Sequence, residues 1–213
     1  MPTRIKFCGF TREQDARAAI ELGADALGLV FFAGSKRYVE PAQLGWLKRL
    51  PSFVQLTGLF VNAEAAEVNA VLQTLPIELL QFHGAETPAF CAQFGRRYIK
   101  AVPMQGLDAA GAVDYMSAHT EACGFLLDNY GVSDIGGSGT AFDWDKIPSH
   151  TPAPLIMAGG LTAGNVGEVI AAVSPYGVDA SSAIETSAGI KSADKMAEFI
   201  TAVRRADALK ADH

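Results

Sequence analysis

The chain opens with a short apolar stretch that turns directly into a helix, Ile5-Lys6-Phe7-Cys8-Gly9-Phe10-Thr11-Arg12. Residues 4–8 predict a first strand that Gly9 ends, and Thr11 followed three residues later by Gln14 predicts a capped helix start. Cys8 is then the last side chain of a strand, and parallel α/β folds hold ligands and chemistry at that edge. The alternative interpretation of Cys8 is a buried thiol that only fills space.

Short apolar strands and helices alternate along the rest of the chain. Further strands are predicted at 25–32, 54–61, 78–82, 98–102, 124–127, 154–157 and 178–180, with helices between them, one of them at about 41–50. Asn62, Thr87 and Thr162 are the predicted N-caps, and Gly23 is a predicted C-cap. Near-continuous apolar strands are typical of a parallel sheet covered by helices.

This repetition predicts a (β/α)8 TIM barrel made by one domain, residues 1–213. A doubly wound open sheet is the competing architecture. That fold usually has fewer strands and a glycine-rich nucleotide loop after the first one, whereas this chain has Cys8-Gly9-Phe10-Thr11 there.

Composition excludes several functional classes. Hydrophobic residues make up 49% of the 213 residues, but no apolar run approaches the ~18 residues of a membrane helix. With no signal-peptide pattern at the N-terminus, we expect a soluble cytoplasmic protein without a membrane partner. The net charge of -6 and the absence of a basic cluster argue against a nucleic-acid partner. No long apolar surface stripe is evident, which favours a monomer over a homodimer.

Cysteine and histidine usage predicts no disulfide framework and no metal site. Cys8, Cys91 and Cys123 are odd in number and widely spaced, so we expect reduced thiols. His119, His150 and His213 lie in predicted loops or the tail, without an accompanying His/Asp/Glu cluster. The methionines at 104, 116 and 157 are most simply core residues.

Reactive and small residues recur at the predicted strand ends, which meet at one rim of a barrel. They are Cys8, His83, Asp128, the Gly159-Gly160 turn and the Ser181-Ser182-Ala183 turn. A thiolate is a good base toward a carbon-bound proton, and a carboxylic acid can supply a proton if it stays protonated. In one small pocket the two groups would titrate as a coupled pair. An N-cap or loop-ordering role is the alternative for Asp128.

The turns after strands seven and eight lie where such barrels commonly bind phosphate, because small residues let backbone N–H groups approach the anion. Two tight turns without a ligand are the alternative. Arg37, in the polar loop after strand two, could reach a substrate carboxylate or simply be solvated. His83 could donate a hydrogen bond to substrate or merely end strand four. Lys6 lies two residues before Cys8, so it points into the barrel, where an ion pair with Asp179 on strand eight is predicted.

Several blocks together resemble phosphoribosylanthranilate isomerase, a βα-barrel enzyme of tryptophan biosynthesis. They span nearly the whole chain in the family's order: Lys6-Phe7-Cys8-Gly9-Phe10-Thr11-Arg12, Ser35-Lys36-Arg37-Tyr38-Val39, Gly58-Leu59-Phe60-Val61-Asn62, Gln81-Phe82-His83-Gly84, Leu126-Leu127-Asp128, Phe142-Asp143-Trp144, Ala158-Gly159-Gly160-Leu161 and Val178-Asp179-Ala180-Ser181-Ser182-Ala183-Ile184-Glu185. This order of blocks is far more specific than any single motif.

The resemblance implies an Amadori rearrangement of N-(5-phosphoribosyl)anthranilate to 1-(2-carboxyphenylamino)-1-deoxyribulose 5-phosphate, with no cofactor or metal. It implies that Cys8 is the general base, Asp128 the general acid, Arg37 the group that holds the anthranilate carboxylate, and the turns at 159–160 and 181–183 the phosphate site. Three residues depart from the family pattern: Thr140 for a common lysine, Lys36 for a common proline and Ala183 for a usual glycine.

Two alternatives bear on this function. The histidine-pathway isomerase performs the same rearrangement, but it typically uses two aspartates at the ends of strands one and five, and here strand one ends in Cys8. A non-catalytic barrel that binds a phosphorylated ligand would tolerate loss of Cys8 and Asp128 with its affinity intact.

Overall fold

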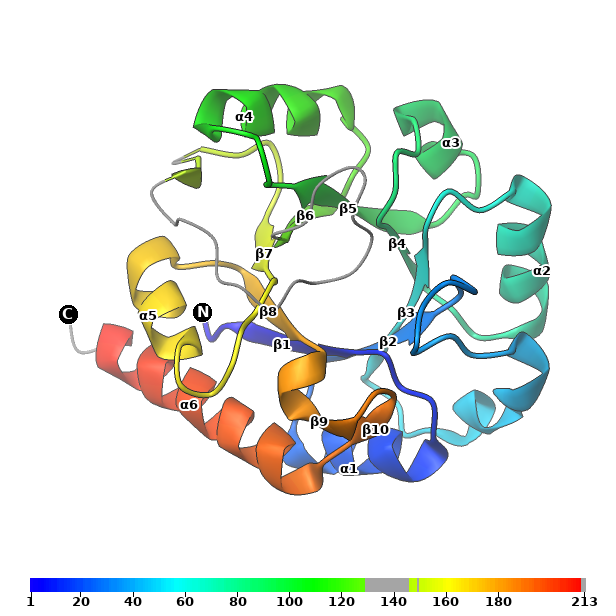
Figure 1. The fold of residues 1–213 in the computed structure, drawn as a ribbon, viewed down its shortest axis with the longest axis horizontal. Helices are drawn as coiled ribbons and strands as arrows, with labels where there is room; N and C mark the ends of the chain where they lie inside the picture. Colours follow the sequence, from blue (N-terminus) through cyan, green and yellow to red (C-terminus); the bar gives the residue numbers. More distant parts are fainter. Residues whose placement is uncertain (129–145, 149, 212–213) are drawn as a thin grey trace.

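The computed structural model of this protein describes residues 1–128, 146–148 and 150–211. Within these residues a parallel barrel closes, because each strand pairs with the next and β8 pairs with β1 (Figure 1). The strands are β1 (Arg4–Cys8), β2 (Ala26–Val30), β3 (Gln55–Phe60), β4 (Leu79–Phe82), β5 (Arg97–Pro103), β6 (Gly124–Asp128), β7 (Leu155–Met157) and β8 (Gly177–Ala180). The predicted (β/α)8 barrel is confirmed.

Helices surround the barrel on its outer side (Figure 1). They are α1 (Glu13–Leu22), η1 (Pro41–Gln43), η2 (Gly45–Arg49), α2 (Ala65–Thr74), α3 (Pro88–Ala92), α4 (Ala109–Ala118), α5 (Val166–Val173), η4 (Ser182–Ile184) and α6 (Ala193–Ala211). Helix α6 packs against both α1 and α5, which joins the end of the chain to its beginning. None of the helices in the described ranges combines the length and the apolar character needed to cross a membrane.

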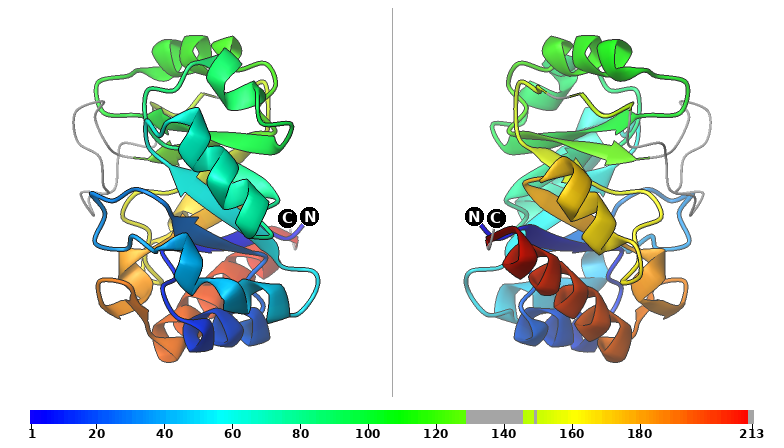
Figure 2. Two further views of the ribbon diagram at one scale, coloured as in Figure 1. Left: turned by 90° about the vertical axis from the view of Figure 1, so that its right-hand side faces the viewer. Right: turned by 90° about the vertical axis from the view of Figure 1, so that its left-hand side faces the viewer.

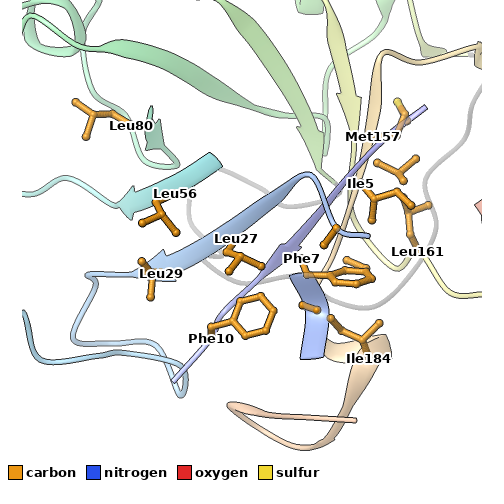
Figure 3. Packing of buried hydrophobic residues seen from close by; sticks show 14 of the residues in the cluster. Ile5, Phe7, Phe10, Leu27, Leu29, Leu56, Leu80, Met157, Leu161 and Ile184 are labelled. Carbon is orange, nitrogen blue, oxygen red and sulfur yellow. The ribbon is translucent and has the colours of Figure 1, made fainter. Parts of the chain in front are cut away.

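Successive side chains of each strand point to opposite faces, which separates an apolar outer face from a partly polar interior. On β1, Ile5 and Phe7 are fully buried in the layer between strands and helices (Figure 3), where the ring of Phe7 meets that of Phe199 edge-on at 5.7 Å. Burying one such side chain contributes about 1.5–3 kcal/mol, so this layer supplies most of the driving force for folding. Lys6 and Cys8, at the alternate positions, face the barrel interior.

The closure of the barrel carries a buried ion pair. Lys6 and Asp179 stand opposite each other in the register of β1 and β8, and Lys6 Nζ lies 2.9 Å from Asp179 Oδ1. Their side chains are 6% and 10% exposed, so the pair is held away from solvent. The ion pair predicted from the sequence is therefore confirmed.

Three of the predicted helix starts are wrong, and at two of them a tertiary contact uses the predicted capping side chain. Helix α1 begins after Arg12, whose guanidinium pairs with Asp15 at 2.7 Å, while the hydroxyl of Thr11 donates to the carbonyl of Gly189 at 2.6 Å. The side-chain oxygen of Asn62 accepts from the backbone N–H of Ala85, which lies in a neighbouring loop.

At the starts of α2 and α5, polar residues close together in the sequence compete for the N-cap position. Helix α2 begins after Glu64, which forms a capping box with Glu67. Helix α5 begins after Asn165, whose side chain accepts from the backbone N–H of Thr162. The helix predicted at 41–50 consists of two short 3-10 helices, η1 and η2, that meet at Leu44 and Gly45. Thr87 does cap α3, and Gly23 ends α1 with a φ of 98°, as predicted.

A small hairpin after β8 was not expected from the sequence. It pairs β9 (Glu185–Ser187) with β10 (Ile190–Lys191) and lies beside the start of α1 (Figure 1). Figure 2 shows this hairpin and the loop after β2 on one side of the molecule and the two termini on the opposite side. The first of these sides is the rim formed by the C-terminal ends of the strands.

Candidate active site

A cavity of about 670 Å³ lies at this rim. Its lining brings together nearly all the residues predicted for the site: Cys8, Arg37, His83, Asp128, Gly159, Gly160, Ser181 and Ser182. Ala183 lies in η4 and is not part of the lining. Thr140, the loop at 129–141 and the block at 142–144 lie outside the described residues. The barrel therefore gathers residues from six strand ends into one space.

Cys8 ends β1 and is only 5% exposed. Burial raises the pKa of its thiol; the ammonium groups of Lys6 and Lys191 oppose this, while Asp179 adds to it. Burial alone would lower the pKa of Lys6, yet it is raised, because Asp179 and Cys8 both favour the ammonium form. Burial thus favours the protonated thiol, while the two ammonium groups lie where they stabilise the thiolate.

Gly28, opposite Cys8 on β2, leaves room for this arrangement. A Cβ at position 28 would lie 2.7 Å from Cys8 Sγ and 3.1 Å from Lys6 Nζ. Cys8 Sγ and Lys6 Nζ therefore both border the space above this glycine.

Asp128 ends β6 and is 8% exposed. Its Oδ2 lies 3.4 Å from Nε2 of His83, the residue that follows β4. Within the described part of the chain, Oδ1 of Asp128 is buried without a hydrogen-bond partner. One carboxyl oxygen is thus oriented by histidine, and the other is left for a bound molecule.

Gln81, on β4, also lines the cavity, although the sequence singles it out only as part of the block Gln81-Phe82-His83-Gly84. Its Nε2 lies 3.1 Å from Nδ1 of His83. An amide nitrogen can only donate, so Nδ1 accepts and Nε2 of the ring carries the proton toward Asp128. The signal was present in the sequence: Gln81 precedes His83 by two residues on a strand and must point the same way.

The backbone on either side of His83 is clamped by a buried ion pair between Lys100 and Glu86, whose charged atoms lie 3.1 Å apart. Lys100 also donates to the carbonyls of Phe82 and Gly84 at 3.2 and 2.6 Å. These two carbonyls bracket His83, so the outer layer of the barrel fixes a residue of the inner site.

Arg37, from the loop after β2, is held over the cavity by Glu185. Its Nε and Nη2 lie 2.9 and 2.8 Å from the two carboxylate oxygens. Its aliphatic stem packs over Gly9, where φ is 84° and an added Cβ would come within 2.4 Å of Arg37 Cδ. The arginine is thus held in an ion pair over the cavity.

The turns after β7 and β8 form another wall of the cavity. Gly159 and Gly160 have φ values of 74° and 69°, a left-handed conformation that L side chains rarely adopt. The hydroxyl of Ser181 donates to the carbonyl of Cys8 at 3.0 Å, so it ties the end of β1 to this wall. Backbone N–H groups of such turns can bind a phosphate without a basic side chain.

A larger cavity of about 870 Å³ lies at the opposite end of the barrel. Five polar residues of its lining pair with one another: Arg4 with Asp25 at 2.8 Å, and Gln55 with both Glu78 and Arg97 at 2.8 Å. They hold the N-terminal ends of the strands together, so the chemistry belongs to the smaller cavity. Among the described residues there is no group of three or more His, Cys, Asp or Glu side chains that could hold a metal ion.

Comparison with known proteins agrees with this geometry. Residues 5–202 match the family model described as N-(5'-phosphoribosyl)anthranilate (PRA) isomerase. The N-(5'-phosphoribosyl)anthranilate isomerase of Dechloromonas aromatica is 48% identical over 209 residues, which cover 97% of this chain and 99% of the relative.

Two solved structures extend the comparison to the fold. The phosphoribosyl anthranilate isomerase of Thermus thermophilus superposes with a TM-score of 0.83 and 32% identity, covering 95% of this chain and 99% of that one. A second such enzyme, solved with reduced 1-(o-carboxyphenylamino)-1-deoxyribulose 5-phosphate, superposes with a TM-score of 0.78 and 31% identity over 95% of this chain and 99% of the other.

Proposed function

Because this chain belongs to the N-(5'-phosphoribosyl)anthranilate isomerase family, we propose that Cys8 and Asp128 are the base and the acid of its Amadori rearrangement. The reaction converts the aldose N-(5-phosphoribosyl)anthranilate into the ketose 1-(2-carboxyphenylamino)-1-deoxyribulose 5-phosphate in tryptophan biosynthesis. The observation that carries the assignment is that a buried thiol at the end of β1 and a buried carboxyl at the end of β6 line the same cavity of about 670 Å³.

The two groups divide the reaction into two proton transfers. Asp128 gives its proton to the ribose ring oxygen as the C1–O bond breaks, and the anthranilate nitrogen lone pair forms the C1=N bond of a Schiff base. Cys8 as thiolate then takes the proton from C2, and those electrons form the C1=C2 bond of an enolamine. Protonation at C1 and loss of the proton from the C2 hydroxyl give the ketone. His83 holds the carboxyl of Asp128 in place for the first step.

Binding uses the two ends of the cavity. Arg37 receives the anthranilate carboxylate at one end, and the turns at 159–160 and 181–183 receive the phosphate at the other. The phosphorylated substrate therefore spans the cavity with C1 and C2 above Cys8. The supporting observation is the left-handed backbone of Gly159 and Gly160, which lets backbone donors approach an anion closely.

The test of the assignment is turnover of freshly generated phosphoribosylanthranilate, followed by loss of its fluorescence. Cys8→Ala should lower kcat by about 10²–10⁴, the usual contribution of general base catalysis. Cys123→Ala, which removes an exposed thiol outside the cavity, is the matched control and should keep normal turnover. Normal turnover by Cys8→Ala would reject Cys8 as the base, and a folded intact protein that binds phosphate without turnover would favour the non-catalytic barrel.

We also propose that residues 1–213 form one domain and act as a cytoplasmic monomer. The packing of α6 on α1 and α5 supports one domain. The large apolar side chains exposed in the described ranges are Met1, Tyr38, Phe53, Tyr176 and Leu209, and no two of them share a helix or strand. Light scattering at micromolar concentration tests the monomer, because a mass near 45 kDa instead of 22.5 kDa would indicate a dimer.

A further inference from the structure

Glu185, at the start of the hairpin β9–β10, is a buried carboxylate that the reaction itself does not use. Its side chain is 4% exposed and contacts two cationic side chains at once. Arg37 approaches it with Nε and Nη2, and Lys191 Nζ lies 2.8 Å from its Oε1. The backbone N–H of Gly189 donates to the same Oε1 at 3.1 Å.

Lys191 anchors this carboxylate to the frame of the site. It is 0% exposed in its side chain, and its Nζ donates to the carbonyls of Cys8 and Ser181 as well as to Glu185. An ammonium group has three hydrogens, and these three acceptors use all of them. Glu185 is therefore fixed to the end of β1 and to the turn after β8.

The contact between Glu185 and Arg37 leaves one edge of the guanidinium for another anion. A guanidinium carries five N–H donors, and the paired contact uses one donor on Nε and one on Nη2. The remaining donors lie on Nη1 and on the outer side of Nη2, and Arg37 and Glu185 both line the cavity. Within the described residues no hydrogen bond occupies these donors, and this edge has the fork geometry that binds a planar carboxylate through two hydrogen bonds.

The charges of the cluster also leave room for a second carboxylate. Glu185 supplies one negative charge against the two positive charges of Arg37 and Lys191. The hydrogen bonds from Arg37 and Lys191 lower the pKa of Glu185 although burial alone would raise it, so it stays ionised. An incoming carboxylate balances the remaining positive charge instead of competing with Glu185 for it.

We propose that Glu185 is a positioning residue that presents Arg37 to the ring carboxylate and so sets the preference of the enzyme for carboxylated over uncarboxylated anilines. This inference rests on the proposed function, in which Arg37 receives that carboxylate. It goes further by naming the residue through which the hairpin β9–β10 controls specificity.

The experiment compares two stable analogues of the product, 1-(2-carboxyphenylamino)-1-deoxyribitol 5-phosphate and its phenylamino counterpart without the carboxylate, by isothermal titration. Wild-type protein should prefer the carboxylated analogue. Glu185→Gln should reduce that preference at least tenfold, while the affinity for the uncarboxylated analogue changes less than threefold. In turnover, KM should rise and kcat should stay within about threefold, because the acid and base are untouched.

Controls separate positioning from general damage. Glu40→Gln changes an exposed carboxylate in the same loop, bonded to Tyr38, and should keep the full preference. Glu185→Asp keeps the charge but shortens the reach, so its loss of preference should lie between those of wild type and Glu185→Gln. It also serves as the decisive variant should the Gln form fail to fold. Arg37→Ala should abolish the preference, and Arg37→Ala with Glu185→Gln should lose no more than Arg37→Ala alone.

The possible failures are distinguishable. If Arg37→Ala keeps the preference, the carboxylate binds elsewhere and the proposed role of Arg37 falls. If Arg37→Ala loses the preference but Glu185→Gln and Glu185→Asp keep it, Glu185 does not position the arginine. A Glu185→Gln protein that binds the carboxylated analogue more tightly would show that Glu185 competes with the ligand, which also overturns the inference.

Discussion

At the scale of single residues, the site depends on buried charges that hold one another in place. Burial raises the pKa of the Cys8 thiol, and the ammonium of Lys6 opposes that rise. Forming the thiolate therefore depends on the interior ion pair beside it. Asp128 is oriented by His83, whose ring is itself oriented by Gln81. Each reactive group therefore has a partner that sets its direction, and removing a reactive group should change the rate more than the binding.

Asp128→Asn tests the acid at this scale. The amide has the shape of the carboxyl but cannot give up a proton, so kcat should fall by about 10²–10⁴ with KM changed little. Asp108→Asn is the matched control, since Asp108 is the N-cap of α4 and asparagine caps a helix equally well. Steady-state turnover of both variants decides the point, and near-normal kcat in a folded Asp128→Asn protein would reject the acid assignment.

At the scale of elements, the rim is held by contacts between neighbouring βα units. Lys100 of β5 clamps the turn after β4, and the hairpin β9–β10 reaches back to Thr11 and to Cys8 at the start of the chain. Helix α4 ends on His119, which packs edge-on against Tyr98 of β5. The layer between strand and helix is therefore sensitive to a charge introduced at its edge.

His119 makes the docking of α4 dependent on pH. Burial, and then the ammonium of Lys100, lower its pKa to about 4, while Glu86 opposes them slightly. In the unfolded chain the pKa is about 6.5, so the unfolded state binds the proton first as the pH falls. The free energy of unfolding should hence decrease from pH 6.5 toward pH 4 through this group.

Urea unfolding at pH 7 and pH 5 measures the effect. Wild-type protein should lose more stability between these two values than His119→Gln, which cannot titrate, and the difference isolates His119 from the carboxylates that titrate in both proteins. Equal losses in the two proteins would contradict the prediction.

At the scale of the whole molecule, the barrel closes where β1 meets β8, and the ion pair of Lys6 with Asp179 lies at that junction. The same junction is covered outside by Phe7 against Phe199 of α6. The interior charge and the outer apolar contact thus join the first strand to the last strand and the last helix. Loss of either should destabilise the barrel as a whole.

Lys6→Met should lower the free energy of unfolding by about 3–5 kcal/mol, because it leaves the buried carboxylate of Asp179 without a partner. Arg17→Met, which breaks a more exposed pair with Glu13, should cost far less, because solvent screens that pair. Adding Asp179→Leu to Lys6→Met should restore part of the loss, since the unpaired charge is then gone. Urea titration measures all three variants, and equal effects of Lys6→Met and Arg17→Met would contradict the argument.

Local patterns in the amino-acid sequence are enough to predict the barrel and to bring several polar residues to its rim. Apolar periodicity is a local property, so it locates the strands to within a few residues. The rule that parallel strand ends meet at one rim brings Cys8, His83, Asp128 and Gly159 together. Alternation along a strand also sufficed to place Lys6 inside and to pair it with Asp179, which the structure confirms.

Tertiary packing alone sets which polar groups meet across long separations in the chain. Thr11 and Asn62 have good local capping chemistry, but contacts with Gly189 and Ala85 occupy their side chains. Arg37 and Glu185 are 148 residues apart, and nothing in the local pattern of either residue indicates the other. The physical reason is that a polar side chain takes the buried partner that packing brings within reach, and that partner is set by the closure of the whole barrel.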